Sequence, residues 1–113
     1  MTPLSNNLNA ARISGMKLQA SAHNLANLNT EGFEGQQVSQ SAGPGGEGLK
    51  AQVSPTHAPA PVILRDGQLR TQSNTDVIKE TVNQVEAAAA FRSNMGVMQV
   101  QDKLTEAVLD IVA

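Results

Sequence analysis

The 113 residues suffice for one small domain, with a net charge of −2 and two Phe as the only aromatic residues. The mild acidity argues against nucleic-acid binding, which needs a basic patch. Without cysteine there are no disulfides or Cys-ligated metals, and two widely separated histidines are a poor start for a zinc site. No stretch approaches the roughly 18 apolar residues of a membrane span, and the first residues lack the pattern of a signal peptide. We therefore predict no membrane insertion and no enzyme, with no catalytic residues, cofactor or metal.

The first 32 residues predict a helix that starts at Thr2-Pro3, a cap residue followed by proline. Apolar or small residues recur in steps of four and three, which is a heptad seam. The seam comprises Leu4, Leu8, Ala11, Gly15, Leu18, Ala22 and Leu25. Turn formers before Gly32 should end the helix by that residue.

Residues 33–72 predict an irregular connector, because they hold most of the prolines and glycines. The glycine-rich run 43–48 lacks the Gly-Lys-Ser/Thr of a phosphate-binding loop, so we interpret it as a flexible tip. Short strands are predicted at residues 33–40, 49–54 and 62–64, the last followed by an Asp66-Gly67 turn.

Residues 73–113 predict a second helix, which begins after the cap formers at 73–76 and contains no proline. Its apolar seam comprises Ile78, Val82, Val85, Val97, Leu104, Val108 and Ile111, with Phe91 as a further packing residue. Asp76 and Glu80 lie in the first turns, where the helix dipole favours acidic groups. The predicted fold is therefore mainly α: long terminal helices paired as an antiparallel coiled coil, with a short connector that contains β-strands.

The first helix carries mostly uncharged amides and hydroxyls outside its seam. Such groups can pair across an interface without the desolvation cost of charges. We therefore expect contacts with further helices, as in a subunit of an assembly.

Two segments resemble signatures of the flagellar axial family, the rod, hook and hook-associated proteins of bacteria. Residues 22–33, Ala-His-Asn-Leu-Ala-Asn-Leu-Asn-Thr-Glu-Gly-Phe, are similar to the family's N-terminal Asn-Ile-Ala-Asn-Ala-Asn-Thr-x-Gly-Tyr. Residues 74–94 are similar to its C-terminal pattern through Asn74, Asp76, Glu80, Phe91 and Asn94. His23, Glu34-Gly35 and Ala88-Ala89-Ala90 depart from the family's usual residues. The short connector is most like that of small proximal-rod members.

The resemblance implies a structural subunit of the flagellar basal-body rod that polymerises through its terminal helices. Its partners would be copies of itself, other axial proteins and the flagellar export apparatus, which would export it without a cleaved signal peptide to the periplasm-spanning rod. Asn24, Asn27, Thr30, Gly32 and Phe33 would shape the exit from the first helix, and Asn74 and Asp76 the entry to the second. The alternative is a free-standing helical adaptor or export-associated paralogue with an axial-type fold.

Overall fold

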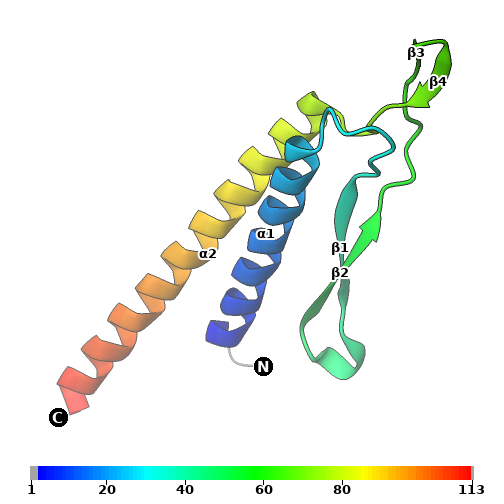
Figure 1. The fold of residues 1–113 in the computed structure, drawn as a ribbon. Coiled ribbons are helices and arrows are strands. Elements are labelled where there is room, and N and C mark those ends of the chain that lie inside the picture. The colour runs from blue at the N-terminus through cyan, green and yellow to red at the C-terminus, as the bar shows by residue number, and fades with distance from the viewer. Residues whose placement is uncertain (1–2, 113) are drawn as a thin grey trace.

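The computed structural model describes residues 3–112 as two long helices joined by two β-hairpins (Figure 1). In chain order the elements are α1 (Pro3–Ala26), β1 (Gln36–Ala42), the 3-10 turn η1 (Pro44–Gly46), β2 (Leu49–Pro55), β3 (Val62–Arg65), β4 (Gln68–Thr71) and α2 (Val77–Val112). The start signal expected at Thr2 lies outside the described residues. Both helices lie close to their predicted positions.

The four strands form two separate two-stranded antiparallel sheets. In the first hairpin Val38 lies opposite Val53, and Gln36 opposite Pro55. In the second, Asp66 and Gly67 have φ angles of 51° and 77°, as an Asp-Gly turn between twisted strands requires. The predicted Asp66-Gly67 turn is therefore present, and a fourth strand follows it.

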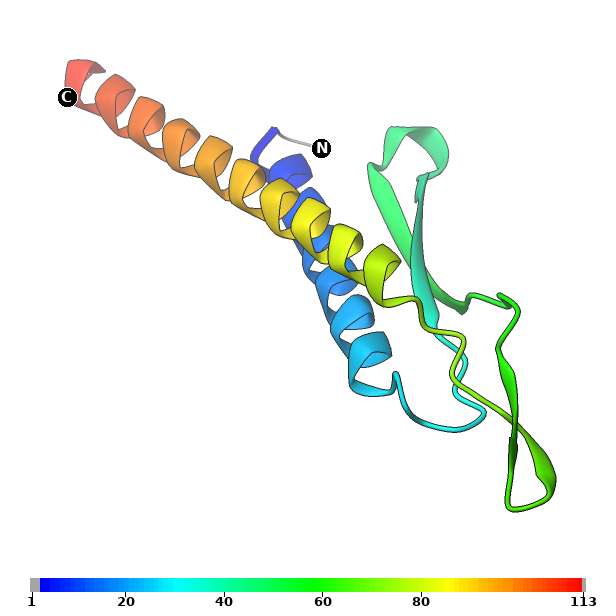
Figure 2. The same ribbon diagram turned by 90° about the horizontal axis from the view of Figure 1, so that it is seen from above.

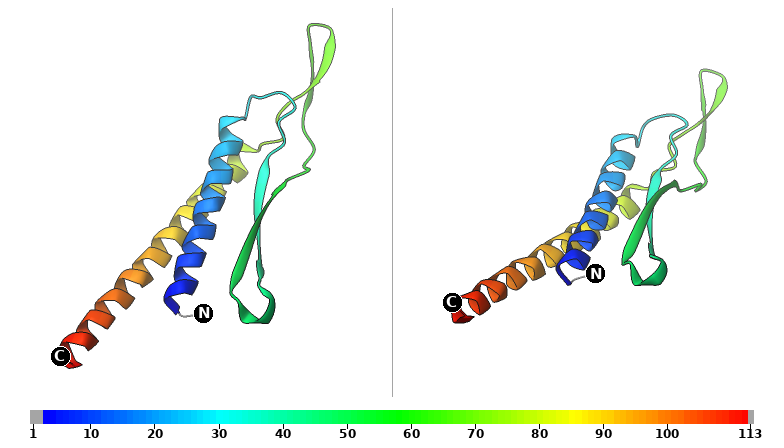
Figure 3. Two further views of the ribbon diagram at one scale, coloured as in Figure 1. Left: turned by 60° about the horizontal axis from the view of Figure 1, so that its bottom comes forward. Right: turned by 90° about the horizontal axis from the view of Figure 1, so that it is seen from below.

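The predicted fold class is wrong. Strands of 7, 7, 4 and 4 residues make up about a fifth of the chain, so the protein is not mainly α. An antiparallel coiled coil is not confirmed either, because α1 and α2 cross and then diverge toward their far ends (Figures 2 and 3). The reason is that the contacting helix surfaces are small and polar, whereas a coiled coil needs large apolar side chains in its seam.

The buried interior is correspondingly small. The buried apolar residues are Ala11, Ile13 and Ala20 of α1 and Ala87 of α2. Buried polar residues accompany them: Ser14, Ser21, Asn24, Ser73 and Glu80. Hydrogen bonds, which must satisfy polar groups taken out of water, therefore carry much of the packing between the elements.

The subunit is elongated, with principal extents of 78 × 28 × 14 Å and a radius of gyration of 19.8 Å. A compact domain of this length would have a radius of gyration of about 13 Å. α2 has 36 residues against 24 in α1, so its C-terminal turns extend beyond the first helix (Figure 1). Within residues 3–112, neither helix combines the length and apolar character needed to cross a membrane.

Candidate functional site

A group of hydrogen-bonded polar residues joins α1, the first hairpin and α2; we call it the polar junction (Ser21, Asn24, Gly35, Gln36, Asn74 and Glu80). Asn24 is its centre. The Asn24 side-chain amide donates to Glu80 Oε1 at 2.9 Å and to the Gln36 carbonyl at 2.8 Å, and Asn24 Oδ1 accepts from the Gln36 N–H at 2.7 Å. One side chain thus connects three elements.

The α1–α2 side of the junction is buried. Asn24 is 1% exposed, Ser21 2% and Glu80 6%. Ser21 Oγ donates to the Glu80 backbone carbonyl at 2.9 Å. Because Glu80 offers both its carboxylate and its carbonyl to α1, this turn of α2 is fixed in register against the end of α1.

The connector side of the junction is built around Asn74. Its Oδ1 accepts a hydrogen bond from the Gly35 N–H at 2.6 Å, and its amide donates to Thr56 Oγ1 at 3.2 Å and to the Ala58 carbonyl at 3.1 Å. Gly35 is buried, and a Cβ there would lie 3.3 Å from Asn74 Oδ1 and 3.5 Å from Asn24 Cγ. Glycine therefore lets two asparagine side chains approach the same backbone.

The helix exit and entry involve the residues singled out in the sequence. After α1, the Asn27 amide donates to the His23 carbonyl and Thr30 Oγ1 donates to Asn27 Oδ1. Gly32 has a φ of 70°, and its N–H donates to the Thr71 carbonyl at 2.9 Å. The Phe33 ring packs edge-on against the His23 ring, with centroids 5.4 Å apart.

Asp76 caps the N-terminus of α2. Its Oδ1 accepts hydrogen bonds from the N–H groups of Ile78 and Lys79, at 2.9 and 3.2 Å. These donors have no partner within the helix, so the cap satisfies them.

Glu31, in the loop after α1, holds the second hairpin. Its two carboxylate oxygens pair with Arg65 of β3 at 3.3 Å and with Arg70 of β4 at 3.1 Å. The hydrogen bond from Arg70, together with the charges of both arginines, outweighs desolvation and keeps the pKa of Glu31 below its ordinary value. Glu31 is therefore ionised while it clamps the hairpin.

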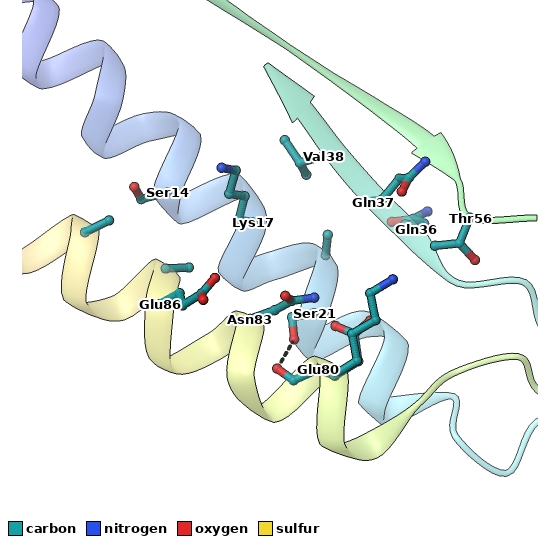
Figure 4. Close-up of a pocket in the computed structure, with 14 residues that line it drawn as sticks. Ser14, Lys17, Ser21, Gln36, Gln37, Val38, Thr56, Glu80, Asn83 and Glu86 are labelled. Carbon is teal, nitrogen blue, oxygen red and sulfur yellow. Dashed lines mark hydrogen bonds between the residues drawn. The ribbon is translucent and has the colours of Figure 1, made fainter. Parts of the chain in front are cut away.

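A cleft of about 480 Å³ lies between the two helices and the first hairpin (Figure 4). Its charged groups are two lysines and two glutamates, Lys17, Lys79, Glu80 and Glu86. Lys17 reaches across to Gln40 Oε1 at 3.4 Å, and the floor on α2 is formed by small residues such as Ala87. The cleft is thus the space left where β1 is tied to α1 by a few polar bonds instead of close apolar packing.

The contact face of α2 is polar. Its less exposed residues recur in a helical repeat: Glu80, Asn83, Gln84, Ala87, Ala88, Asn94, Met98 and Gln101. Hydrogen bonds from α1 reach the two ends of this row, at Glu80 from Ser21 and Asn24, and at Gln101 from Asn7 at 3.4 Å. The amides that we expected to contact other subunits are in part used inside this one.

The predicted apolar seam of α2 is left exposed by α1; we call it the outer stripe (Ile78, Val82, Val85, Val97, Leu104, Val108 and Ile111). At 100° per residue, Ile78, Val82 and Val85 lie on the side opposite the contact face, whereas the later members, from Val97 on, lie closer to the edge of that face. Their exposed fractions run from 46% to 84%. Phe91 is also exposed, at 37%. The subunit by itself leaves this whole stripe in water.

The predicted seam of α1 is divided between interior and surface. Ala11 is buried, whereas Gly15, Leu18 and Leu25 are half-buried. Leu8 and Ala22 are exposed, and the side chain of Leu4 lies outside the described part of the chain. The seam residues of the two helices are thus not brought together as one apolar interface.

The sequence patterns do not reveal the roles of four junction residues: Ser21, Gly35, Gln36 and Glu80. The sequence indicates Glu80 as an acidic group near a helix start and as part of the family-like pattern, but not as a partner of α1. One available signal was that Asn24 and Glu80 both lie within the two family-like segments, which suggests a shared structural task.

Residues 67–111 match the family described as the flagellar basal body rod FlgEFG protein C-terminal region. The match includes β4 and almost all of α2, with the outer stripe and Glu80. No curated protein matches the sequence. The matched family is structural and not enzymatic, and its place is the flagellar basal body. Residues 67–111 are thus similar to the C-terminal region of flagellar basal-body rod proteins, in agreement with the resemblance found in the sequence.

Proposed function

We propose that the protein is a structural subunit of the flagellar basal-body rod that polymerises through its terminal helices. The observation that carries the proposal is the outer stripe. Large apolar side chains run along α2 with exposed fractions of 46% to 84%. Exposed apolar surface of that extent marks an interaction site on a soluble protein.

The composition of the helix contact supports the same proposal. Alanine, serine and amide side chains hold α1 to α2, while the larger aliphatic residues of α2 are left for other molecules. A protein that functions as a monomer gains most stability by burying those residues itself. Their placement on the outside is consistent with a subunit that becomes stable on assembly.

We propose that neighbouring subunits cover the outer stripe together with the exposed seam residues of α1, Leu8 and Ala22. The polar junction would set the relative position of the helices, so that every subunit presents these surfaces in the same way. Partners are copies of this chain and other axial proteins. The flagellar export apparatus would deliver the chain to the periplasm-spanning rod without a cleaved signal peptide, as the family resemblance implies.

Fractionation of cells that make the protein tests the proposal. Basal bodies are extracted with detergent, purified and blotted for the protein alongside a cytoplasmic control protein. The subunit should copurify with basal bodies. Recovery only as a folded, free monomer or dimer would contradict the proposal and favour the helical adaptor.

A further inference from the structure

We propose that Glu34 and His57 form a latch that sets the direction of the second hairpin, and that the chain hinges at His57 when the latch opens. The inference concerns one chain by itself and goes beyond the proposed function. It is carried by a residue in an unusual backbone conformation that is held by a single carboxylate.

His57 lies in the segment that joins the two hairpins, residues 56–61, which we call the strap. Its φ angle is 52°, in the left-handed region. Among the described residues other than glycine, Asp66 shares a positive φ, and the turn of the second hairpin accounts for it. A left-handed conformation is uncommon for a residue with a Cβ, and residues held in such conformations concentrate at switch regions. His57 therefore needs contacts that hold it there.

One oxygen of Glu34 supplies those contacts. Glu34 Oε1 accepts a hydrogen bond from the His57 backbone N–H at 3.1 Å, and Nδ1 of the His57 ring lies 2.6 Å from the same oxygen. The side chains remain 77% exposed for His57 and 44% for Glu34. A pair so open to water contributes little to stability, so the latch can open and close at a small cost in free energy.

The rest of the strap is held or stiff. Residues 58–61 are Ala-Pro-Ala-Pro, in which each proline has a fixed φ and each alanine before a proline is restricted to extended conformations. Thr56 is tied to the polar junction, because its N–H donates to the Gly35 carbonyl at 2.8 Å and its Oγ1 accepts from the Asn74 amide at 3.2 Å. Rotation of the strap is therefore concentrated at His57.

The second hairpin is attached at its base and not along its length. It projects from one end of the molecule, and among residues 3–112 neither the helices nor the first hairpin make an extensive contact with it (Figures 1 and 3). Its other ties are polar contacts, including the pairs that Glu31 makes with Arg65 and Arg70. When the latch opens, residue 57 can leave the left-handed region, and the hairpin turns to a new direction with its exposed Leu64 and Leu69.

Distance measurements between spin labels test the latch, and the chain offers a background without native cysteine. Labels at Arg12→Cys, on α1, and Gln68→Cys, on β4, report the direction of the hairpin; both positions are exposed. Labels at Arg12→Cys and Gln99→Cys, on α2, report whether the two helices stay in place. The labelled full-length chain is diluted with unlabelled chain, so that only distances within one chain are measured.

The hairpin pair should give one narrow distance distribution in the otherwise natural chain. Glu34→Ala should broaden it, and His57→Val should move its maximum, since a β-branched residue is strained at positive φ. Both variants should leave the helix pair unchanged. His57→Gly is the matched control for the backbone, because glycine adopts a positive φ without strain and should keep the maximum. Glu47→Ala removes an exposed carboxylate near the tip of the first hairpin and should leave both distributions unchanged.

An unchanged hairpin distribution in Glu34→Ala would overturn the inference, as would an equal shift of the maximum in His57→Val and His57→Gly. Equal broadening of the helix pair would also overturn it, because Glu34 would then support the whole subunit. Broadening in Glu31→Gln but not in Glu34→Ala would assign the direction of the hairpin to Glu31 instead. The fractionation of basal bodies tests the proposed function separately, so either result can fail without the other.

Discussion

Asn24 of α1 and Glu80 of α2 are 56 residues apart in the sequence, yet the Asn24 amide donates to the Glu80 carboxylate at 2.9 Å with both side chains buried. The same amide also holds the first hairpin through Gln36. A buried carboxylate is costly unless it is hydrogen-bonded, so the pair depends on both members. Asn24 is therefore the residue that links both helices and the first hairpin directly.

Asn24→Ala should weaken the polar junction by about 2–3 kcal/mol, because it removes partners from a buried carboxylate and from the Gln36 backbone. Native-state hydrogen exchange at the amides of Gln36 and Glu80 measures the free energy of local opening. Asn29→Ala, at an exposed position in the following turn, is the control and should change it by less than about 0.5 kcal/mol. Equal effects from the two variants would argue against the role given to Asn24.

Gly35→Ala should also open the junction, because the new Cβ would lie 3.3 Å from Asn74 Oδ1 and force a shift there. We expect a loss of about 1 kcal/mol in the same exchange measurement. Gly15→Ala should act in the opposite direction, since it lies within α1 and nothing is within 4 Å of its Cβ position. Alanine there should stabilise the helix of the isolated subunit by up to about 1 kcal/mol. A stabilising Gly35→Ala would contradict the close packing described for the junction.

Leu104→Glu should prevent incorporation into basal bodies while leaving the isolated subunit unchanged. Leu104 is 62% exposed, so a charge there costs the free subunit little, but it is costly once a neighbour covers the site. Gln99→Glu, an exposed position of α2 outside the outer stripe, adds the same charge as a control and should incorporate normally. Circular dichroism of each variant and blots of purified basal bodies give the two readouts. Normal incorporation of Leu104→Glu would exclude the C-terminal part of the stripe as a contact.

The hairpin clamp should loosen in acid. The lowered pKa of Glu31 means that its contribution is present above the pKa of the unfolded chain and is lost as the pH falls through the lower, folded value. Hydrogen exchange of the β3–β4 amides, corrected for intrinsic rates, should therefore show less protection at acidic than at neutral pH. Glu31→Gln should show the weaker protection at both pH values. If Glu31→Gln retains the pH dependence of amide protection, that dependence arises from another titratable group.

Much of the local structure could be predicted from the sequence. Proline at the start of α1, the turn formers before Gly32 and the cap at Asp76 are local signals, and the helices begin and end near them. The Asp66-Gly67 turn likewise depends only on backbone preferences of two residues. Local signals of this kind can be recognised in the sequence without knowledge of the fold.

Which residues of the two helices contact each other could not be predicted in the same way. Periodicity identified the apolar stripe of α2 but did not tell whether α1 or another molecule covers it, and we assigned it to α1. The contact face instead contains Glu80, Asn83 and Asn94, whose polarity does not signal burial. The burial of Glu80 is favourable only because Asn24 lies opposite, a relationship between distant segments that one sequence does not display.

The interior of alanine, serine and amide groups also sets how the subunit responds to temperature. The heat capacity of unfolding rises with newly exposed apolar area and falls with exposed polar area. Since few large apolar side chains are buried between the helices, that heat capacity should lie below the usual 12–15 cal/mol/K per residue, a value typical of well-packed domains. The stability curve of the free subunit is then shallow, with a low and broad thermal transition. Contacts that bury the aliphatic side chains of α2 would increase the heat-capacity change of unfolding, and the thermal transition would become sharper.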